Sequence, residues 1–314
     1  MADFDVLVLG GVGIDTIVRV PDLTIPSGDS CGVPPITDYV AHTGNGVALG
    51  FHALGLRTKF LDFLGEDAQG AQVLARYAAV GLDFSYLPAP CGTPRSVNLV
   101  DDEGRRFSFF DGRHPEDLLL PEEFYLPFLA NCRHAHIAAG RAFGAFEHAR
   151  SLGISTSTDI HAWDGVNPWA TVPAREADLV FLSSAGVPEQ IDELMRSILD
   201  AGRAAMVVAT EGAAGCRVLT RAEPRIQRYP AVVPERPVVD SNGAGDAFSA
   251  AFMSRWFAGR PVGECVLAGT VAGAFACGAV GTHEEMITKE RLAMAIPRAV
   301  RSPRPDDDGG VEPI

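Results

Sequence analysis

The clearest place for chemistry in this chain is an acidic residue in a glycine-rich turn. Residues 237–248 run Pro-Val-Val-Asp-Ser-Asn-Gly-Ala-Gly-Asp-Ala-Phe. Gly243 and Gly245 make a loop with little side-chain bulk, and the apolar run 247–257 predicts a helix directly after it. The amides at the start of a helix lie at the positive end of its dipole, so this turn suits a phosphate. Asp246 would add a base that takes a proton from an attacking hydroxyl during phosphoryl transfer.

The same residues also fit an ordinary connection between a strand and a helix. Val238 and Val239 predict the end of a strand. Aspartate is common at the N-terminus of a helix, where its carboxylate accepts from free amides, so Asp246 could be a simple cap. The turn by itself leaves both interpretations open.

The stretch Asp240-Ser241-Asn242-Gly243-Ala244-Gly245-Asp246 resembles the Asp-Thr-x-Gly-Ala-Gly-Asp signature of the ribokinase family, the PfkB-type carbohydrate and nucleoside kinases. Serine replaces threonine and keeps the hydroxyl. The resemblance implies that Asp246 is the catalytic base and that the turn before it stabilises the transferring phosphoryl group through Gly243, Ala244 and Gly245. It also implies that three residues of the turn bind the nucleotide, namely Asn242, Gly243 and Gly245.

A second nucleotide-binding stretch is predicted upstream. The apolar strand 205–209 leads into Thr210-Glu-Gly-Ala-Ala-Gly215. This pattern is similar to the nucleotide phosphate loop of the family, and Thr210, Gly212 and Gly215 are its expected contacts, since small residues let backbone and hydroxyl approach a phosphate. The alternative is a plain glycine turn before a hairpin strand.

The N-terminal strand also ends in glycines. Residues 5–10 predict a buried parallel strand, and Gly10-Gly-Val-Gly13 follows it. A dinucleotide-binding turn is disfavoured because no third glycine opens a helix, and residues 16–20 alternate as a further strand. The resemblance places Asp15 at the end of the first strand, where it would bind sugar hydroxyls; a turn aspartate is the alternative.

The predicted acceptor loop departs from the family pattern. Gly44 and Gly46 predict a flexible turn, and residues 47–54 predict a helix that stops at a glycine. The family has a glycine pair and then an asparagine in this loop. In a gap-free alignment, Ala41-His42 stands at the glycine pair and Gly46 at the asparagine. Substrate contacts are therefore expected from Gly44 and Asn45, with a helix-capping role as the alternative for Asn45.

The resemblance implies ATP and Mg²⁺ as cofactors. The family's Asn and Glu that help to hold hydrated magnesium correspond here to Ser183 and Gly186. Asp159 lies near the C-terminal end of a predicted strand, which makes it a candidate for the phosphate and metal region. A monovalent cation such as K⁺ near Asp240 is a further expectation that parts of the family suggest.

Two histidines could suggest another metal site. His134 and His136 lie on one face of a predicted strand, but no third ligand is identifiable. The favoured interpretation is a strand edge in polar surroundings, and no residue is predicted as a metal ligand.

Composition excludes several other functions. The 314 residues are 47% hydrophobic and carry a formal net charge of −14, which disfavours a nucleic-acid partner. No apolar run is long enough to span a membrane, the first residues lack the basic region of a signal peptide, and the six cysteines are scattered. A cytoplasmic protein without a membrane partner is expected.

The order of predicted elements indicates an α/β fold. From residue 134 strands and helices alternate, which predicts a parallel sheet covered on both faces. The resemblance implies a ribokinase-like αβα sandwich over residues 1–300, with a small β-sheet lid from about 15–45 and 92–112. Residues 301–314 predict a disordered tail. An exposed lid sheet would offer an edge for a homodimer.

The sequence therefore predicts an ATP-dependent kinase that transfers the γ-phosphoryl group to a hydroxyl of a small-molecule sugar or nucleoside. The alternative is a non-catalytic sugar or nucleotide sensor on the same fold, which the altered Ser183 and Gly186 favour and Asp246 disfavours. A dehydrogenase is the third hypothesis.

Overall fold

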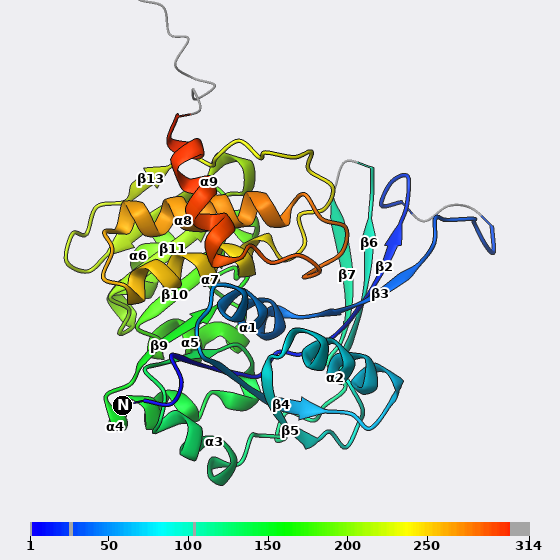
Figure 1. The fold of residues 1–314 in the computed structure, drawn as a ribbon, viewed down its shortest axis with the longest axis horizontal. Helices are drawn as coiled ribbons and strands as arrows, with labels where there is room; N and C mark the ends of the chain where they lie inside the picture. The colour runs from blue at the N-terminus through cyan, green and yellow to red at the C-terminus, as the bar shows by residue number, and fades with distance from the viewer. Residues whose placement is uncertain (1, 25–27, 103–104, 302–314) are drawn as a thin grey trace, which may run out of the picture.

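A computed structural model describes residues 2–24, 28–102 and 105–301 of the chain. Over these residues it consists of a large twisted sheet with helices on both faces and a smaller sheet at one side (Figure 1). The predicted tail lies outside the described residues beyond Arg301. Among the described residues, no helix has the length and apolarity needed to cross a membrane.

The large sheet has the strand order β13-β12-β11-β10-β9-β8-β1-β4-β5. Neighbours from β5 through to β11 are parallel, whereas β12 and β13 pair antiparallel. This confirms the predicted, mainly parallel central sheet. The strands are β1 (Val6–Leu9), β4 (Thr58–Leu64), β5 (Asp83–Pro88), β8 (His134–Ile137), β9 (Ser155–Asp159), β10 (Leu179–Ser183), β11 (Met206–Thr210), β12 (Cys216–Thr220) and β13 (Gln227–Tyr229).

Helices cover both faces because the central strands are apolar on both sides. In β1, Val6 and Val8 belong to one core cluster, and Leu7 and Leu9 belong to the other. The first cluster is covered by α1 (Thr43–Ala53), α2 (Ala68–Val80), α7 (Ala244–Phe257), α8 (Val262–Ala276) and α9 (Lys289–Arg301). The second is covered by α3 (Glu122–Leu129), α4 (Ala145–Leu152), α5 (Thr171–Glu176) and α6 (Ile191–Ala201).

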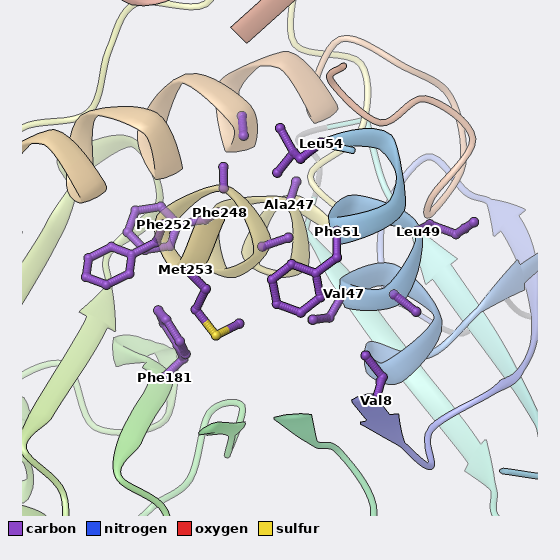
Figure 2. Close-up of a cluster of buried hydrophobic side chains, with 14 of the residues drawn as sticks. Val8, Val47, Leu49, Phe51, Leu54, Phe181, Ala247, Phe248, Phe252 and Met253 are labelled. Atoms are coloured by element: carbon purple, nitrogen blue, oxygen red, sulfur yellow. The ribbon is translucent and has the colours of Figure 1, made fainter. Parts of the chain in front are cut away.

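One apolar contact fixes the two helices that carry the predicted site. Figure 2 shows α1 and α7 side by side, with Phe51 of α1 directed toward Met253 of α7 and Phe181 of β10 below them. All three side chains are at most 1% exposed. This packing brings together the first turns of both helices, because a Cβ added at Gly46 of α1 would lie 2.7 Å from the Cβ of Asp246.

The smaller sheet stands beside the main body and has the order β3-β2-β6-β7 (Figure 1). Strands β2 and β6 are parallel, and the outer pairs are antiparallel. Its strands are β2 (Gly13–Arg19), β3 (Thr37–Ala41), β6 (Arg95–Val100) and β7 (Arg106–Asp111).

Three local predictions are wrong. No strand forms at Val238 and Val239, which are 63% and 43% exposed, because the amide of Val239 donates to the carbonyl of Cys277 at the end of α8 and not to a neighbouring strand. Helix α7 begins at Ala244, three residues earlier than predicted, and α1 begins at Thr43. Gly44 and Gly46 therefore lie in the first turn of a helix and do not form a flexible loop.

The two histidines of β8 also lie in surroundings that were not expected. β8 runs between β1 and β9, so His134 and His136 are buried in the middle of the sheet and are not at an edge. Hydroxyls of Ser155 and Ser157 contact their ring nitrogens at 2.7–2.9 Å. Burial lowers the pKa of His134 to about 3 and that of His136 to about 4, so both rings are neutral.

Candidate active site

Asp246 lies in the first turn of α7, just after Gly243, which no other residue could replace without backbone strain and a steric clash. Gly243 precedes the helix with φ 75°, and a Cβ there would lie 2.0 Å from the carbonyl oxygen of Thr282. Gly245 has open space where a side chain would be. The amide of Ala244 donates to the carbonyl of Ser241 at 3.3 Å. The predicted turn is thus an open helix N-terminus suited to an anion.

Asp246 is paired with a histidine that the sequence analysis did not single out. Nε2 of His283 lies 2.7 Å from Oδ2 of Asp246, and the two side chains are 1% and 14% exposed. Gly46 leaves room for this pair, since a Cβ at that position would lie 2.3 Å from His283 Nε2. The glycine at the family's asparagine position is therefore part of the site.

Asn45 does not face an open acceptor site. Its side chain is fully buried, its Nδ2 contacts the carbonyl of Val40 at 3.1 Å and Nδ1 of His283 at 2.9 Å, and its Oδ1 accepts from the hydroxyl of Tyr77 at 2.8 Å. With these contacts made, the predicted direct bond to an acceptor hydroxyl does not fit this arrangement. Gly44 is packed directly against the backbone, because a Cβ there would lie 1.8 Å from the carbonyl oxygen of Gly10.

Asp15 lies inside β2 and not at the end of the first strand, because β1 ends at Leu9 and the chain turns into the small sheet. It is 7% exposed, and its carboxylate accepts from the hydroxyl of Thr282 at 3.2 Å. His42 Nε2 is 3.6 Å from its other oxygen and 3.2 Å from the hydroxyl of Ser96. Polar groups from the small sheet and from the loop after α8 therefore meet near the first turn of α1.

His42 has an unusual backbone for a histidine. Its φ is 73°, in the left-handed region where glycine is favoured, and it occupies a place where the family has a glycine. Its ring lies 5.6 Å from that of Phe110, and burial lowers its pKa. A strained backbone beside buried polar groups makes His42 a candidate functional residue.

The small sheet is tied to the glycine-rich turn by two arginines. Arg19 of β2 donates to Oδ2 of the buried Asp240 at 2.9 Å. Arg106 of β7 donates to the side-chain oxygen of Asn242, which is 2% exposed. Neither arginine was predicted, because no local pattern links these strands to a turn more than 130 residues away.

The other predicted nucleotide residues follow β11. Thr210 ends this strand and donates to the carbonyl of Leu182 at 3.3 Å. Gly212 and Gly215 have φ of 58° and 105°, and a Cβ at Gly215 would lie 2.0 Å from the carbonyl oxygen of Tyr229. Gly215 is therefore required by the hairpin itself. In the ladder Thr210 pairs with Ser183 of β10, so both lie at the C-terminal edge of the parallel sheet.

Asp159 ends β9 at the same edge and is electrostatically coupled to Asp246. Burial raises its pKa, the negative charge of Asp246 raises it further, and His161 opposes this shift. Gly186 is held against the carbonyl oxygen of Ala162, which would lie 2.3 Å from an added Cβ, so a glutamate does not fit there. In the described ranges no group of three or more His, Cys, Asp or Glu side chains is placed to hold a metal ion.

A mainly parallel αβα fold with a glycine-rich helix start, an acidic residue in its first turn and a small accessory sheet defines a class of sugar and nucleoside kinases. The family model described as pfkB family carbohydrate kinase matches residues 167–289. The chain is 45% identical over 297 residues to acarbose 7(IV)-phosphotransferase of Actinoplanes sp., covering 94% of this chain and 98% of that one. The chain belongs to the pfkB family of carbohydrate kinases.

Other relatives and solved structures agree. Fructoselysine 6-kinase of Escherichia coli is 27% identical, covering 79% of this chain and 94% of its own. The microbiome-derived acarbose kinase Mak1 superimposes with a TM-score of 0.86 at 42% identity, covering 94% and 99% of the two chains. Arabidopsis thaliana ribokinase shares the fold, with a TM-score of 0.77 at 19% identity and the same coverage. An ATP-dependent carbohydrate kinase is thus confirmed, and the sensor and dehydrogenase hypotheses are not favoured.

The geometry of His42 generates a prediction. In His42→Gly, relief of left-handed strain offsets the lost ring contacts, so the free energy of unfolding should change by no more than about 1 kcal/mol. The KM for the acceptor should rise by about tenfold, because the ring lies beside Asp15, the expected contact for acceptor hydroxyls. Steady-state kinetics and thermal unfolding measure the two effects.

Arg113→Gly is the matched control. Arg113 also has a positive φ, of 42°, but its guanidinium pairs with Asp111 in the small sheet. It should leave the acceptor KM unchanged. An unchanged KM in His42→Gly would show that the ring does not contact the acceptor.

Proposed function

We propose that this kinase phosphorylates a hydroxyl of an acceptor built from several sugar-like units, as acarbose is for its relatives, with Asp246 as the catalytic base. The observation that carries the proposal is the 45% identity with acarbose 7(IV)-phosphotransferase across 94% of the chain. The locant 7(IV) in that name indicates an acceptor of several units.

The acceptor would lie between the small sheet and the first turns of α1 and α7. Asp15 supplies carboxylate oxygens for ring hydroxyls, and His42 lies beside it. Phe110 is 69% exposed with its ring 5.6 Å from that of His42, so it offers an apolar face for a sugar ring. The small sheet would act as a lid that excludes water from the transfer step.

The nucleotide phosphates would lie across the edge formed by α7 and β11. The open N-terminus at Gly243, Ala244 and Gly245 would stabilise the charge of the transferring group. Thr210, Gly212 and Gly215 would lie along the remaining phosphates, and Asn242 would hold the turn through its bond with Arg106.

Magnesium fits this edge through Asp159. Its carboxylate lies close enough to Asp246 for their charges to repel, and a cation bound with the phosphates would relieve that repulsion. Bound Mg²⁺ would neutralise charge on the β- and γ-phosphates. Gly186 supplies no carboxylate where the family has a glutamate, so Asp159 would carry that role.

The protein's own part in the reaction is a proton transfer with orientation. Asp246 would accept the proton of the acceptor hydroxyl, whose oxygen forms a bond to the γ-phosphorus as the bond to the β-phosphate oxygen breaks and ADP leaves. A carboxylate in the first turn of α7 lies beside the amides that stabilise the transferring group.

The decisive test is the isosteric Asp246→Asn variant, assayed with acarbose, simple sugars, sugar phosphates and nucleosides. ATP consumption by the wild type should depend on the acceptor and be fastest with the acarbose-like compound. The variant should lose about 10²–10⁴-fold in kcat while still binding ATP, because only the base is removed. Full turnover in Asp246→Asn would contradict the assignment of the base, and wild-type activity with nucleosides alone would contradict the acceptor.

We infer further that phosphorylation needs no monovalent cation. K⁺ is expected near the Asp240 loop, yet the carboxylate of Asp240, 2% exposed, is already paired with Arg19 at 2.9 Å. The guanidinium supplies a fixed positive charge at the start of the turn. Wild-type kcat should agree within about twofold in K⁺, Na⁺ and tetramethylammonium salts of equal ionic strength.

Arg19→Ala is the companion variant. It leaves Asp240 buried without its partner, which should lower kcat and allow K⁺, but not tetramethylammonium, to restore part of it. Strong activation of the wild-type enzyme by K⁺ would refute the inference.

We propose a homodimer through the outer face of the small sheet. Phe107, Phe109 and Val97 are 54%, 58% and 37% exposed. The alternation of β7 directs Phe107 and Phe109 away from Arg106 and Phe110, which face the site, and Val97 of β6 pairs with Phe109 on the same face. Sedimentation should show a dimer for the wild type and a monomer for Phe109→Glu. A monomeric wild type at micromolar concentration would reject the proposal.

A further inference from the structure

We propose that His283 is a positioning residue for Asp246, which it holds with one oxygen occupied and the other directed to the acceptor. This inference rests on the proposed role of Asp246 as base. Nε2 of His283 lies 2.7 Å from Oδ2, and Oδ1 has no hydrogen-bond partner among the described residues. A carboxylate fixed through one oxygen presents the other in a constant orientation, which is what a general base requires.

The position of the ring proton follows from the neighbouring asparagine. Nδ2 of Asn45 lies 3.1 Å from the carbonyl of Val40, which can only accept, so the amide orientation is fixed. The same Nδ2 lies 2.9 Å from Nδ1 of His283 and must donate to it. Nδ1 is therefore unprotonated, and the single proton of the neutral ring is on Nε2, where it is donated to Asp246.

Tyr77 closes this chain of hydrogen bonds at the other end. Its hydroxyl, on α2, donates to Oδ1 of Asn45 at 2.8 Å. Burial raises the pKa of Tyr77 well above its usual value, so the hydroxyl remains a donor. Tyr77, Asn45 and His283 are each at most 2% exposed, so water cannot easily replace any of these bonds.

This arrangement limits what His283 can do. Because Nε2 already carries a proton and Nδ1 accepts from Asn45, the neutral ring cannot take the acceptor proton from Asp246. Its effect is to stabilise the carboxylate form by donation. The charged or titratable groups that also interact with Asp246 are Asp159 and His136, whose ring is neutral.

Two variants of His283 separate positioning from packing. In His283→Gln the amide nitrogen can stand near the place of Nε2 and donate to Asp246, whereas the shorter side chain of His283→Asn reaches only the place of Nδ1. We expect His283→Asn to lose about 10–100-fold in kcat with ATP KM changed by less than about threefold, and His283→Gln to keep kcat within about fivefold.

The pH dependence of kcat distinguishes positioning from packing, because a loss of packing alone would not shift it. His283→Asn removes the donor that stabilises the carboxylate form of Asp246, so the acidic limb of kcat should shift to higher pH in this variant. In His283→Gln the limb should stay near that of the wild type. Thermal unfolding of both variants checks that they fold.

The outcomes distinguish this inference from the proposed function. Loss of turnover in Asp246→Asn together with wild-type kcat and pH profile in His283→Asn would overturn the role of His283 alone. Equal losses in the Asn and Gln variants, without a shift of the acidic limb, would assign His283 to packing and also overturn it. Full turnover in Asp246→Asn would overturn the base itself.

Discussion

The site depends on the close approach of two helix N-termini. Helices α1 and α7 come from opposite ends of the chain, and their first turns meet where Gly46 faces Asp246. A methyl group at residue 46 would overlap both Asp246 and His283, so this approach requires glycine. The apolar contact of Phe51 and Met253 one to two turns further along holds the helices in this position (Figure 2).

Burial then determines the state of the polar groups around Asp246. The neutral ring of His136 lies near Asp246, and the neutral ring of His134 lies against Phe257 at the other end of α7, so neither adds positive charge to the site. Burial and the charge of Asp246 raise the pKa of Asp159, so a cation bound there with the nucleotide phosphates would favour its ionised form. A kinase site needs such a balance, because its substrates bring both the phosphate charge and the cation that offsets it.

The small sheet is coupled to this centre by charge and by shape. Arg19 and Arg106 reach from β2 and β7 to the glycine-rich turn, while His42 and Asp15 lie where the small sheet meets α1. Movement of the small sheet would therefore alter the acceptor pocket and the phosphate turn together. These contacts would give a physical reason for acceptor binding and closure of the small sheet to occur together with phosphoryl transfer.

The sequence by itself determined the fold class, the family and the position of the acidic residue in the glycine-rich turn, because these depend on local patterns. Apolar runs buried on both faces predict parallel strands, and Asp240 to Asp246 is a continuous motif whose helix start needs only neighbouring residues. The acceptor side was less predictable: Asn45 was expected to contact substrate, and the structure buries it behind His283. His283, Arg19 and the strained His42 emerged only from the tertiary structure. His283 contacts Asp246, 37 residues away in the chain, Arg19 contacts Asp240, 221 residues away, and His42 contacts Asp15, 27 residues away. The periodicity and spacing of a single sequence do not report such contacts.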